Sequence, residues 1–229
     1  MVYGELGRQP ITLHIRERGV NYWARLLSNQ QKLAWHTYQI ALTMPHRLPW
    51  LGHIASMLND SGMTYIWASQ SVPSGPWLKL TYHSIQVDQF LQTWYTGVQS
   101  SPKCITYRIF KEELRFENYL TALPYKYSKQ IAKFRTSNHR LPIERQRYEN
   151  IAREERKCDL CTLGFIGDEY HYILECPYFK SLRHKLLPSY CWQRPNILKL
   201  RWLFTCDAEK LQKLAIYVSS VMDTFVETT

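Results

Sequence analysis

The sequence contains no apolar run of the roughly 20 residues that a membrane-spanning helix needs. The nearest stretch, Leu214–Met222, is interrupted by two serines. The first ten residues also lack the apolar segment of a secretory signal peptide. We therefore expect an intracellular protein, nuclear or cytoplasmic, with no membrane partner and with its six cysteines reduced.

Several motifs that carry catalysis are also missing. A phosphate-binding loop needs a Gly-Lys pair, and the sequence has none. The nucleophile elbow G-x-S-x-G, the zinc-protease helix H-E-x-x-H and the dinucleotide loop G-x-G-x-x-G do not occur either. Residues 168–171 spell the DExH pattern of helicases, but without a phosphate-binding loop we interpret this as coincidence. The sequence predicts a protein that is not an enzyme.

Strand signals are equally scarce, because no long alternating run and no Asn-Gly or Asp-Gly hairpin turn is present. Apolar residues instead recur at helical spacing. We predict a mainly α fold, with a helical array followed by a small zinc-binding module and C-terminal helices. A division near residue 100 would separate an N-terminal helical region, 1–100, from a basic region with the zinc module, 101–229. The helices expected are one that starts at Ile11 after Pro10, then 30–43, 50–58, 87–98, 107–123 and 126–136, and a last helix capped by Asp207.

Positive charge is concentrated in the middle of the chain. The formal net charge is +10, and residues 103–157 hold 14 basic and 7 acidic side chains. Such an excess favours polyanionic partners. Lys126, Lys129 and Lys133 share one helical face, and the positive run continues through Arg135, Arg140, Arg145, Arg147 and Arg153.

Aromatic residues are interleaved with these bases: Tyr125, Tyr127, Phe134 and Tyr148. The mixture suits phosphate contacts combined with base stacking, so we predict a surface for RNA or DNA. Little sequence preference is expected, because no recognition helix with base-edge readers is visible. The alternative is a solvated helix face beside core aromatics.

Four metal-ligand residues lie within nineteen positions: Cys158, Cys161, His171 and Cys176. A C-x2-C pair can place two thiolates about 2.3 Å from one zinc ion, and Gly164 and Gly167 let the loop double back. Three sulfurs and one nitrogen complete a tetrahedron, which leaves no position for a substrate water. We predict a structural zinc site. The alternatives are two buried thiols, a buried histidine and an unrelated cysteine, or thiols oxidised to a disulfide.

The remaining cysteines have no partner at ligand spacing and are expected to be small buried hydrophobes: Cys104, Cys191 and Cys206.

Four segments carry the sharpest motifs: Phe134 to Tyr148, Glu155 to Cys161, Asp168 to His171 and Glu175 to Pro177. Together they resemble the zinc-binding C-terminal region of non-LTR retrotransposon reverse transcriptases. In that family an arginine-rich helix with an R-x-x-x-H ending precedes the C-x2-C and H-x4-C ligands. Arg135 and His139 match that ending, and the stretch from Tyr3 to Trp23 resembles the segment that comes after the polymerase domain in such elements. The resemblance implies a region that helps to grip template RNA or target DNA.

The sequence also departs from that family. A reverse transcriptase holds two metal ions on paired aspartates, and this chain has no two adjacent aspartates. Its palm, fingers and any endonuclease are absent. The sequence therefore predicts a tail without its enzyme.

Two function classes remain open. The first is a non-catalytic nucleic-acid-binding accessory region, which requires the 103–157 bases on one contiguous face. The second is a zinc-stabilised helical protein-protein interaction module, from a domesticated or remnant element. That module would scatter the bases and expose an apolar patch to a protein partner.

Overall fold

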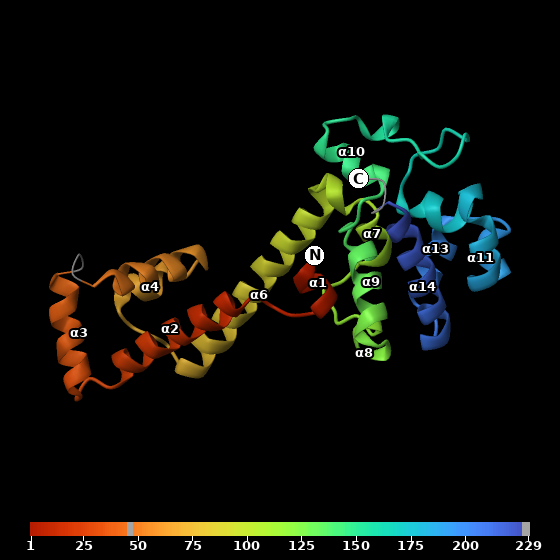
Figure 1. The fold of residues 1–229 in the computed structure, drawn as a ribbon. Helices are drawn as coiled ribbons and strands as arrows, with labels where there is room; N and C mark the ends of the chain where they lie inside the picture. The colour runs from red at the N-terminus through yellow and green to blue at the C-terminus, as the bar shows by residue number, and fades with distance from the viewer. Residues whose placement is uncertain (45–47, 226–229) are drawn as a thin grey trace. The chain divides into compact units, whose positions relative to one another are not determined.

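The computed structural model describes residues 1–44 and 48–225 and is mainly α-helical (Figure 1). The described residues form no β-strand, and the one isolated antiparallel bridge joins Lys157 to Ile166. The predicted fold class is confirmed. Within the described part of the chain, no helix is both long and apolar enough to cross a bilayer.

The chain divides into two compact units. The N-terminal unit is Gln9–Tyr95, and the C-terminal unit combines Met1–Arg8 with Thr96–Thr229. Division of the sequence near residue 100 placed the first eight residues with the N-terminal region, whereas in the structure they belong to the C-terminal unit. The reason is a buried ion pair between Glu5 and Arg135.

The N-terminal unit is a set of helices around one aromatic core. Trp23, Leu58 and Ile66 are fully buried there, and the Trp23 indole donates to the Tyr38 hydroxyl at 2.8 Å. Helix α2 begins after Pro10, whose fixed φ suits a helix start. The helices are α2 (Ile11–Ser28), α3 (Leu33–Thr43), α4 (Pro49–Asp60), α5 (Thr64–Ser69) and the larger part of α6 (Gly75–Ser100).

The C-terminal unit packs around a second core, to which Tyr172, Leu214 and Val218 contribute fully buried side chains. Its elements are α1 (Val2–Leu6), η2 (Pro102–Cys104), α7 (Tyr107–Phe110), α8 (Tyr119–Ala122), α9 (Tyr125–Arg135), α10 (Pro142–Tyr148), η3 (Arg153–Glu155), η4 (His171–Glu175), η5 (Pro177–Phe179), α11 (Lys180–Leu186), α12 (Ser189–Trp192), α13 (Ile197–Leu203) and α14 (Ala208–Thr224). The carboxylate of Asp207 caps α14 by accepting from the Lys210 amide at 3.0 Å, as predicted.

The single helix predicted for residues 107–123 is wrong. It is two short helices, α7 and α8, separated by residues 111–118. The Lys111 side chain is buried, where its ammonium binds the Glu117 carboxylate and the Arg115 carbonyl, both at 2.5 Å. The Glu117 amide in turn donates to the Glu5 carbonyl at 3.0 Å. Tertiary pairing with α1 therefore replaces helical hydrogen bonds in this segment.

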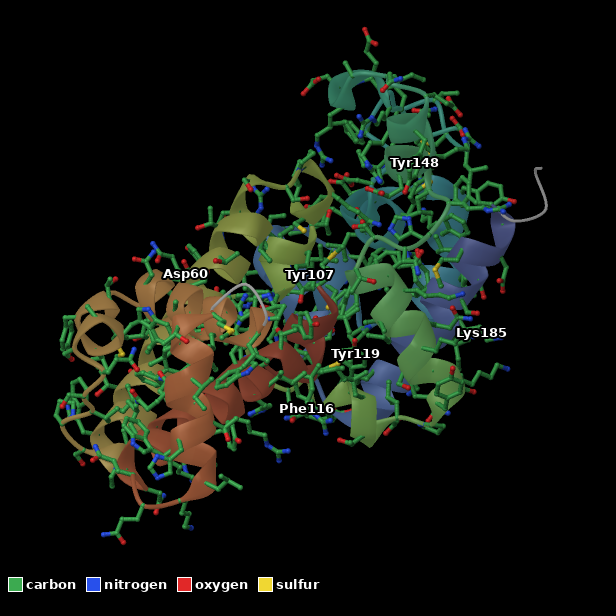
Figure 2. All side chains as sticks on the ribbon, turned by 90° about the vertical axis from the view of Figure 1, so that its left-hand side faces the viewer. Asp60, Tyr107, Phe116, Tyr119, Tyr148 and Lys185 are labelled. Atoms are coloured by element: carbon green, nitrogen blue, oxygen red, sulfur yellow. The ribbon has the colours of Figure 1, made fainter. Side chains whose placement is uncertain are left out.

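Helix α1 is fixed to this segment by close packing. Gly7 ends α1 with φ of +58°, and a Cβ there would lie 2.2 Å from the backbone nitrogen of Phe116. Figure 2 labels Phe116 and the nearby Tyr119, whose hydroxyl donates to Glu5 at 2.5 Å. Only glycine fits at position 7, for both reasons.

Candidate metal centre

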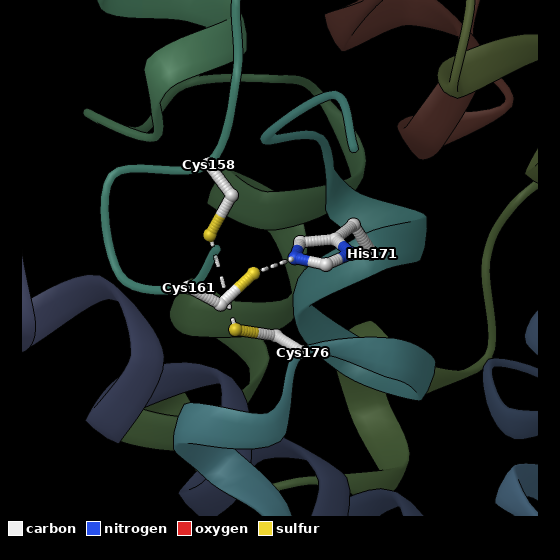
Figure 3. A group of neighbouring side chains, drawn as sticks. All are labelled: Cys158, Cys161, His171 and Cys176. Carbon is white, nitrogen blue, oxygen red and sulfur yellow. Dashed lines mark hydrogen bonds between the residues drawn. The ribbon is translucent and has the colours of Figure 1, made fainter. Parts of the chain in front are cut away.

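The four predicted ligands converge on one point of the C-terminal unit (Figure 3). Their ligand atoms all lie within 4.8 Å of one another. The Sγ atoms of Cys158 and Cys176 are 3.9 Å apart, and the Cys161 Sγ lies 3.4 Å from the His171 Nε2. For bonds of about 2.3 Å to sulfur and 2.0 Å to nitrogen, the edges of a tetrahedron are roughly 3.6–3.8 Å long. The two distances given are close to these edges, so the cluster could hold one metal ion.

The loop that carries the first two ligands turns as a knuckle. The Leu160 amide points at the Cys158 sulfur, 3.4 Å away. Gly164 adopts φ of +69°, so the chain can double back, and the Cys158 amide then donates to the Phe165 carbonyl at 2.9 Å. Gly167 serves packing instead, because a Cβ there would lie 3.0 Å from Pro142.

His171 is held with its Nε2 toward the sulfurs. It begins the π-helical turn η4, which is closed by a hydrogen bond from the Cys176 amide to the His171 carbonyl. The Asp168 carboxylate accepts from the His171 amide at 3.0 Å, and burial raises the pKa of this carboxyl to about 6. On the far side of the ring, Nδ1 is buried without a hydrogen bond and lies 3.6 Å from Glu175. A carboxylate there favours the tautomer that leaves Nε2 free to bind a metal.

Burial sets the protonation of the cluster. Burial raises the pKa of the Cys176 thiol to about 12, so without a metal this thiol is neutral at physiological pH. A bound divalent ion reverses that preference and stabilises thiolates. All six cysteines are free thiols. The disulfide alternative does not fit, because sulfurs 3.9 Å apart are well beyond the 2.05 Å of an S–S bond.

Arg183 supplies a buried positive charge beside the cluster. Its guanidinium donates to the carbonyls of Ile173 and Cys176, each at 2.7 Å. Among the described residues, no carboxylate forms an ion pair with it, although its side chain is buried. Three thiolates around a divalent ion carry one net negative charge, which would compensate this arginine.

A second buried network ties the ligand loop to the rest of the unit. The carboxylate of Glu169 is fully buried and contacts His139 Nε2 at 2.9 Å, and it accepts from the hydroxyls of Ser137 and Thr106 at 2.8 Å each. Burial opposes ionisation of this group, but the contact with His139 and the other hydrogen bonds lower the pKa of Glu169 to about 2. These contacts fix the loop two residues before His171.

The structure separates the predicted nucleic-acid contacts into two classes. Lys126, Lys129 and Lys133 lie on one side of α9, and Arg140 is exposed after it. Arg135 is only 1% exposed and pairs with Glu5 and Glu117, so its assignment to a surface contact is wrong. The other three bind carboxylates of their own unit: Arg145 pairs with Asp159, Arg147 with Glu144 and Arg153 with Asp168.

The segment after Tyr148 is irregular. The arginine-rich stretch ends its helix there, Asn150 takes φ of +57°, and a short turn at η3 comes next. Arg156 then donates to the carbonyls of Ile151 and Ile143. The bases of this segment support the loop rather than form a continuous basic helix.

Four residues of this unit were not predicted: Glu5 and Glu117, which bind Arg135, and Glu169 and Arg183, which lie beside the metal ligands. Each of them acts through a partner. Glu169 lay within the DExH pattern and Glu5 within the stretch from Tyr3 to Trp23. The one available signal was the R-x-x-x-H pattern, whose arginine and histidine both prove to be buried partners of carboxylates. Comparison with known proteins adds no further assignment: no family model matches the chain, and no curated protein or solved structure matches it.

Proposed function

We propose that the chain is a non-catalytic, zinc-stabilised region that binds nucleic acid along helix α9. The observation that carries the proposal is that three lysines of this helix form no ion pair. Among the described residues, no ion pair involves Lys126, Lys129 or Lys133, whereas most bases around them are engaged inside the protein. An uncompensated row of lysines on one helix face is suited to phosphates.

The surface beside these lysines also suits bases. Tyr125 is 78% exposed, and the Lys129 ammonium lies 5.8 Å from its ring centre. One hollow of the surface contains Tyr125, Lys129 and Lys133, and a second contains Lys133 and Arg140. Lys133 and Asn138 line both hollows, so the two hollows form one groove. Positive charge with an exposed aromatic ring is the usual platform for single strands.

The metal in this proposal is zinc, because three cysteines and one histidine at tetrahedral spacing are its preferred ligands. With four protein ligands a tetrahedral ion has no position for a substrate, so the site has a structural role. An intracellular location, nuclear or cytoplasmic, accompanies the proposal, since the thiols must stay reduced to bind metal.

The motif resemblance supports the same assignment, and we propose a relation to the C-terminal region of non-LTR retrotransposon reverse transcriptases. The support is the ligand spacing together with Arg135 and His139. Both act inside the fold, where they bind Glu5 and Glu169. The resemblance therefore concerns the architecture around the metal rather than direct contact with nucleic acid.

The salt dependence of binding tests the proposal. With three or four phosphate contacts, the slope of log K against log salt for single-stranded RNA should be about −2 to −3. Replacing Lys126, Lys129 and Lys133 by alanine should flatten that slope by about 2 and weaken binding to all sequences alike. The measurement is a filter-binding titration with RNA and duplex DNA at several salt concentrations.

The matched control is Lys213→Ala, because Lys213 is also an exposed lysine of the C-terminal unit but pairs with Glu209. This variant should retain both affinity and slope. A flat salt response, or a triple variant that binds like the wild type, would contradict the proposal and favour the protein-interaction module. The exposed apolar residues of α2 are the observation that favours that second candidate.

A further inference from the structure

Helix α2 of the N-terminal unit carries an apolar face that the unit leaves uncovered. One side of the helix is buried through Leu13, Val20 and Trp23. On the other side Ile11, Ile15 and Tyr22 are 69, 62 and 56% exposed. Three large apolar side chains on one short face are more than scattered surface hydrophobics.

The exposed positions have a regular pattern. Ile11, Ile15, Arg18, Tyr22 and Arg25 are separated alternately by four and three residues, which is the spacing of a coiled-coil seam. The same residues line a hollow in the surface of this unit, together with His14, Glu17, Asn21 and Lys79. A second hollow shares Asn21, Arg25 and Lys79, so the two form one groove along α2 and the start of α6.

The charges of the groove are unbalanced. Arg18, Arg25 and Lys79 are exposed, and among the described residues none of them enters an ion pair. The one acidic residue of the groove, Glu17, already contacts the imidazole of His83. The groove thus offers two isoleucines at one end, and three unpaired cations with Tyr22 among them along the rest.

We propose that this groove docks an amphipathic helix that carries acidic residues, supplied by a partner protein. The seam spacing matches the way a helix lays apolar side chains along another helix, and Arg18 and Arg25 at seam positions select carboxylates. Ile11 and Ile15, two of the three exposed apolar side chains, have no ring on which bases stack, so nucleic acid would leave them uncovered and is a poorer occupant than an apolar helix face. A second copy of this chain is also poorer, because it would bring the same cations together.

This inference goes beyond the nucleic-acid proposal, which concerns a surface of the other unit. The test uses a fluorescent helical peptide of about three heptads, with leucine at the seam positions and glutamate at the flanking ones. Fluorescence anisotropy with the full chain should show saturable binding. Ile15→Asp should weaken it at least about tenfold, as expected for loss of an apolar anchor that the partner covers.

The matched control is Ile40→Asp, because Ile40 is 62% exposed like Ile15 but lies on α3, outside the groove. It should bind the peptide like the wild type. Both changes are at exposed positions, so circular dichroism should show an unchanged fold. Exchanging the charges tests for a gain of binding. The double variant Arg18→Glu, Arg25→Glu should no longer bind the glutamate peptide and should instead bind a peptide in which lysine replaces each glutamate.

Three results would overturn the proposal. The first is peptide binding that is absent, or equal in the Ile15→Asp and Ile40→Asp variants. The second is displacement of the peptide by single-stranded RNA from the wild type but not from Arg18→Glu with Arg25→Glu, which would make the groove a nucleic-acid site. The third is a dimer in sedimentation that Ile15→Asp converts to monomer, which would make a second copy the occupant.

Discussion

Replacing Cys158 by serine is expected to release the metal and loosen residues 150–190, while the N-terminal unit stays folded. Structural zinc contributes on the order of 10 kcal/mol to the folding of small modules. Cys158 and Cys176 belong to the core of the C-terminal unit, so loss of the ion also disturbs their neighbours Tyr172 and Ile173. The N-terminal unit has a separate core around Trp23.

Hydrogen-exchange mass spectrometry checks this expectation, because it reports each segment separately. Amides of residues 150–190 should exchange faster in Cys158→Ser, and in wild type treated with a chelator, than in untreated wild type. Cys206→Ser is the matched control, since Cys206 is also a free thiol but lies outside the cluster. Equal protection in the two serine variants would exclude a stabilising metal at Cys158.

Replacing Arg135 by alanine is expected to lower the free energy of unfolding by about 3–5 kcal/mol, the usual effect of breaking a buried ion pair from one side. The guanidinium binds Glu5 at 2.9 and 3.1 Å and Glu117 at 3.0 Å, and it lies 5.3 Å from the centre of the Tyr119 ring. Among the described residues, removing it leaves the buried Glu5 carboxylate without a basic partner and the mostly buried Glu117 with Lys111 alone.

Urea unfolding of the C-terminal unit measures the effect. Arg145→Ala is the matched control, because Arg145 also pairs with a carboxylate, that of Asp159, but both side chains are well exposed. Its loss should change stability by less than about 1 kcal/mol. If the two variants unfold at the same urea concentration, Arg135 has no special structural role.

The metal ligands could be predicted from sequence because their chemistry is local. Cys158 and Cys161 lie on one tight turn, and His171 and Cys176 lie on one further turn of the chain. The start of α2 after Pro10 and the cap of α14 at Asp207 were predictable for the same reason: backbone preference and a neighbouring side chain decide them.

The role of each basic residue could not be predicted in this way. Whether an arginine faces solvent or a carboxylate depends on partners far along the chain, and Glu5 lies 130 residues before Arg135. The same long-range contact explains the failed prediction for 107–123, where pairing with α1 overrides a helical pattern. Similarly, His139 became a partner of Glu169 only once the fold brought them together.

X-ray absorption at the zinc edge of the purified chain, combined with its metal content, is the decisive measurement for the metal centre. We expect one zinc per chain, with three sulfur neighbours at about 2.3 Å and one nitrogen at about 2.0 Å. A folded C-terminal unit without zinc, or a spectrum with oxygen in place of a sulfur neighbour, would contradict a structural zinc site at these four residues.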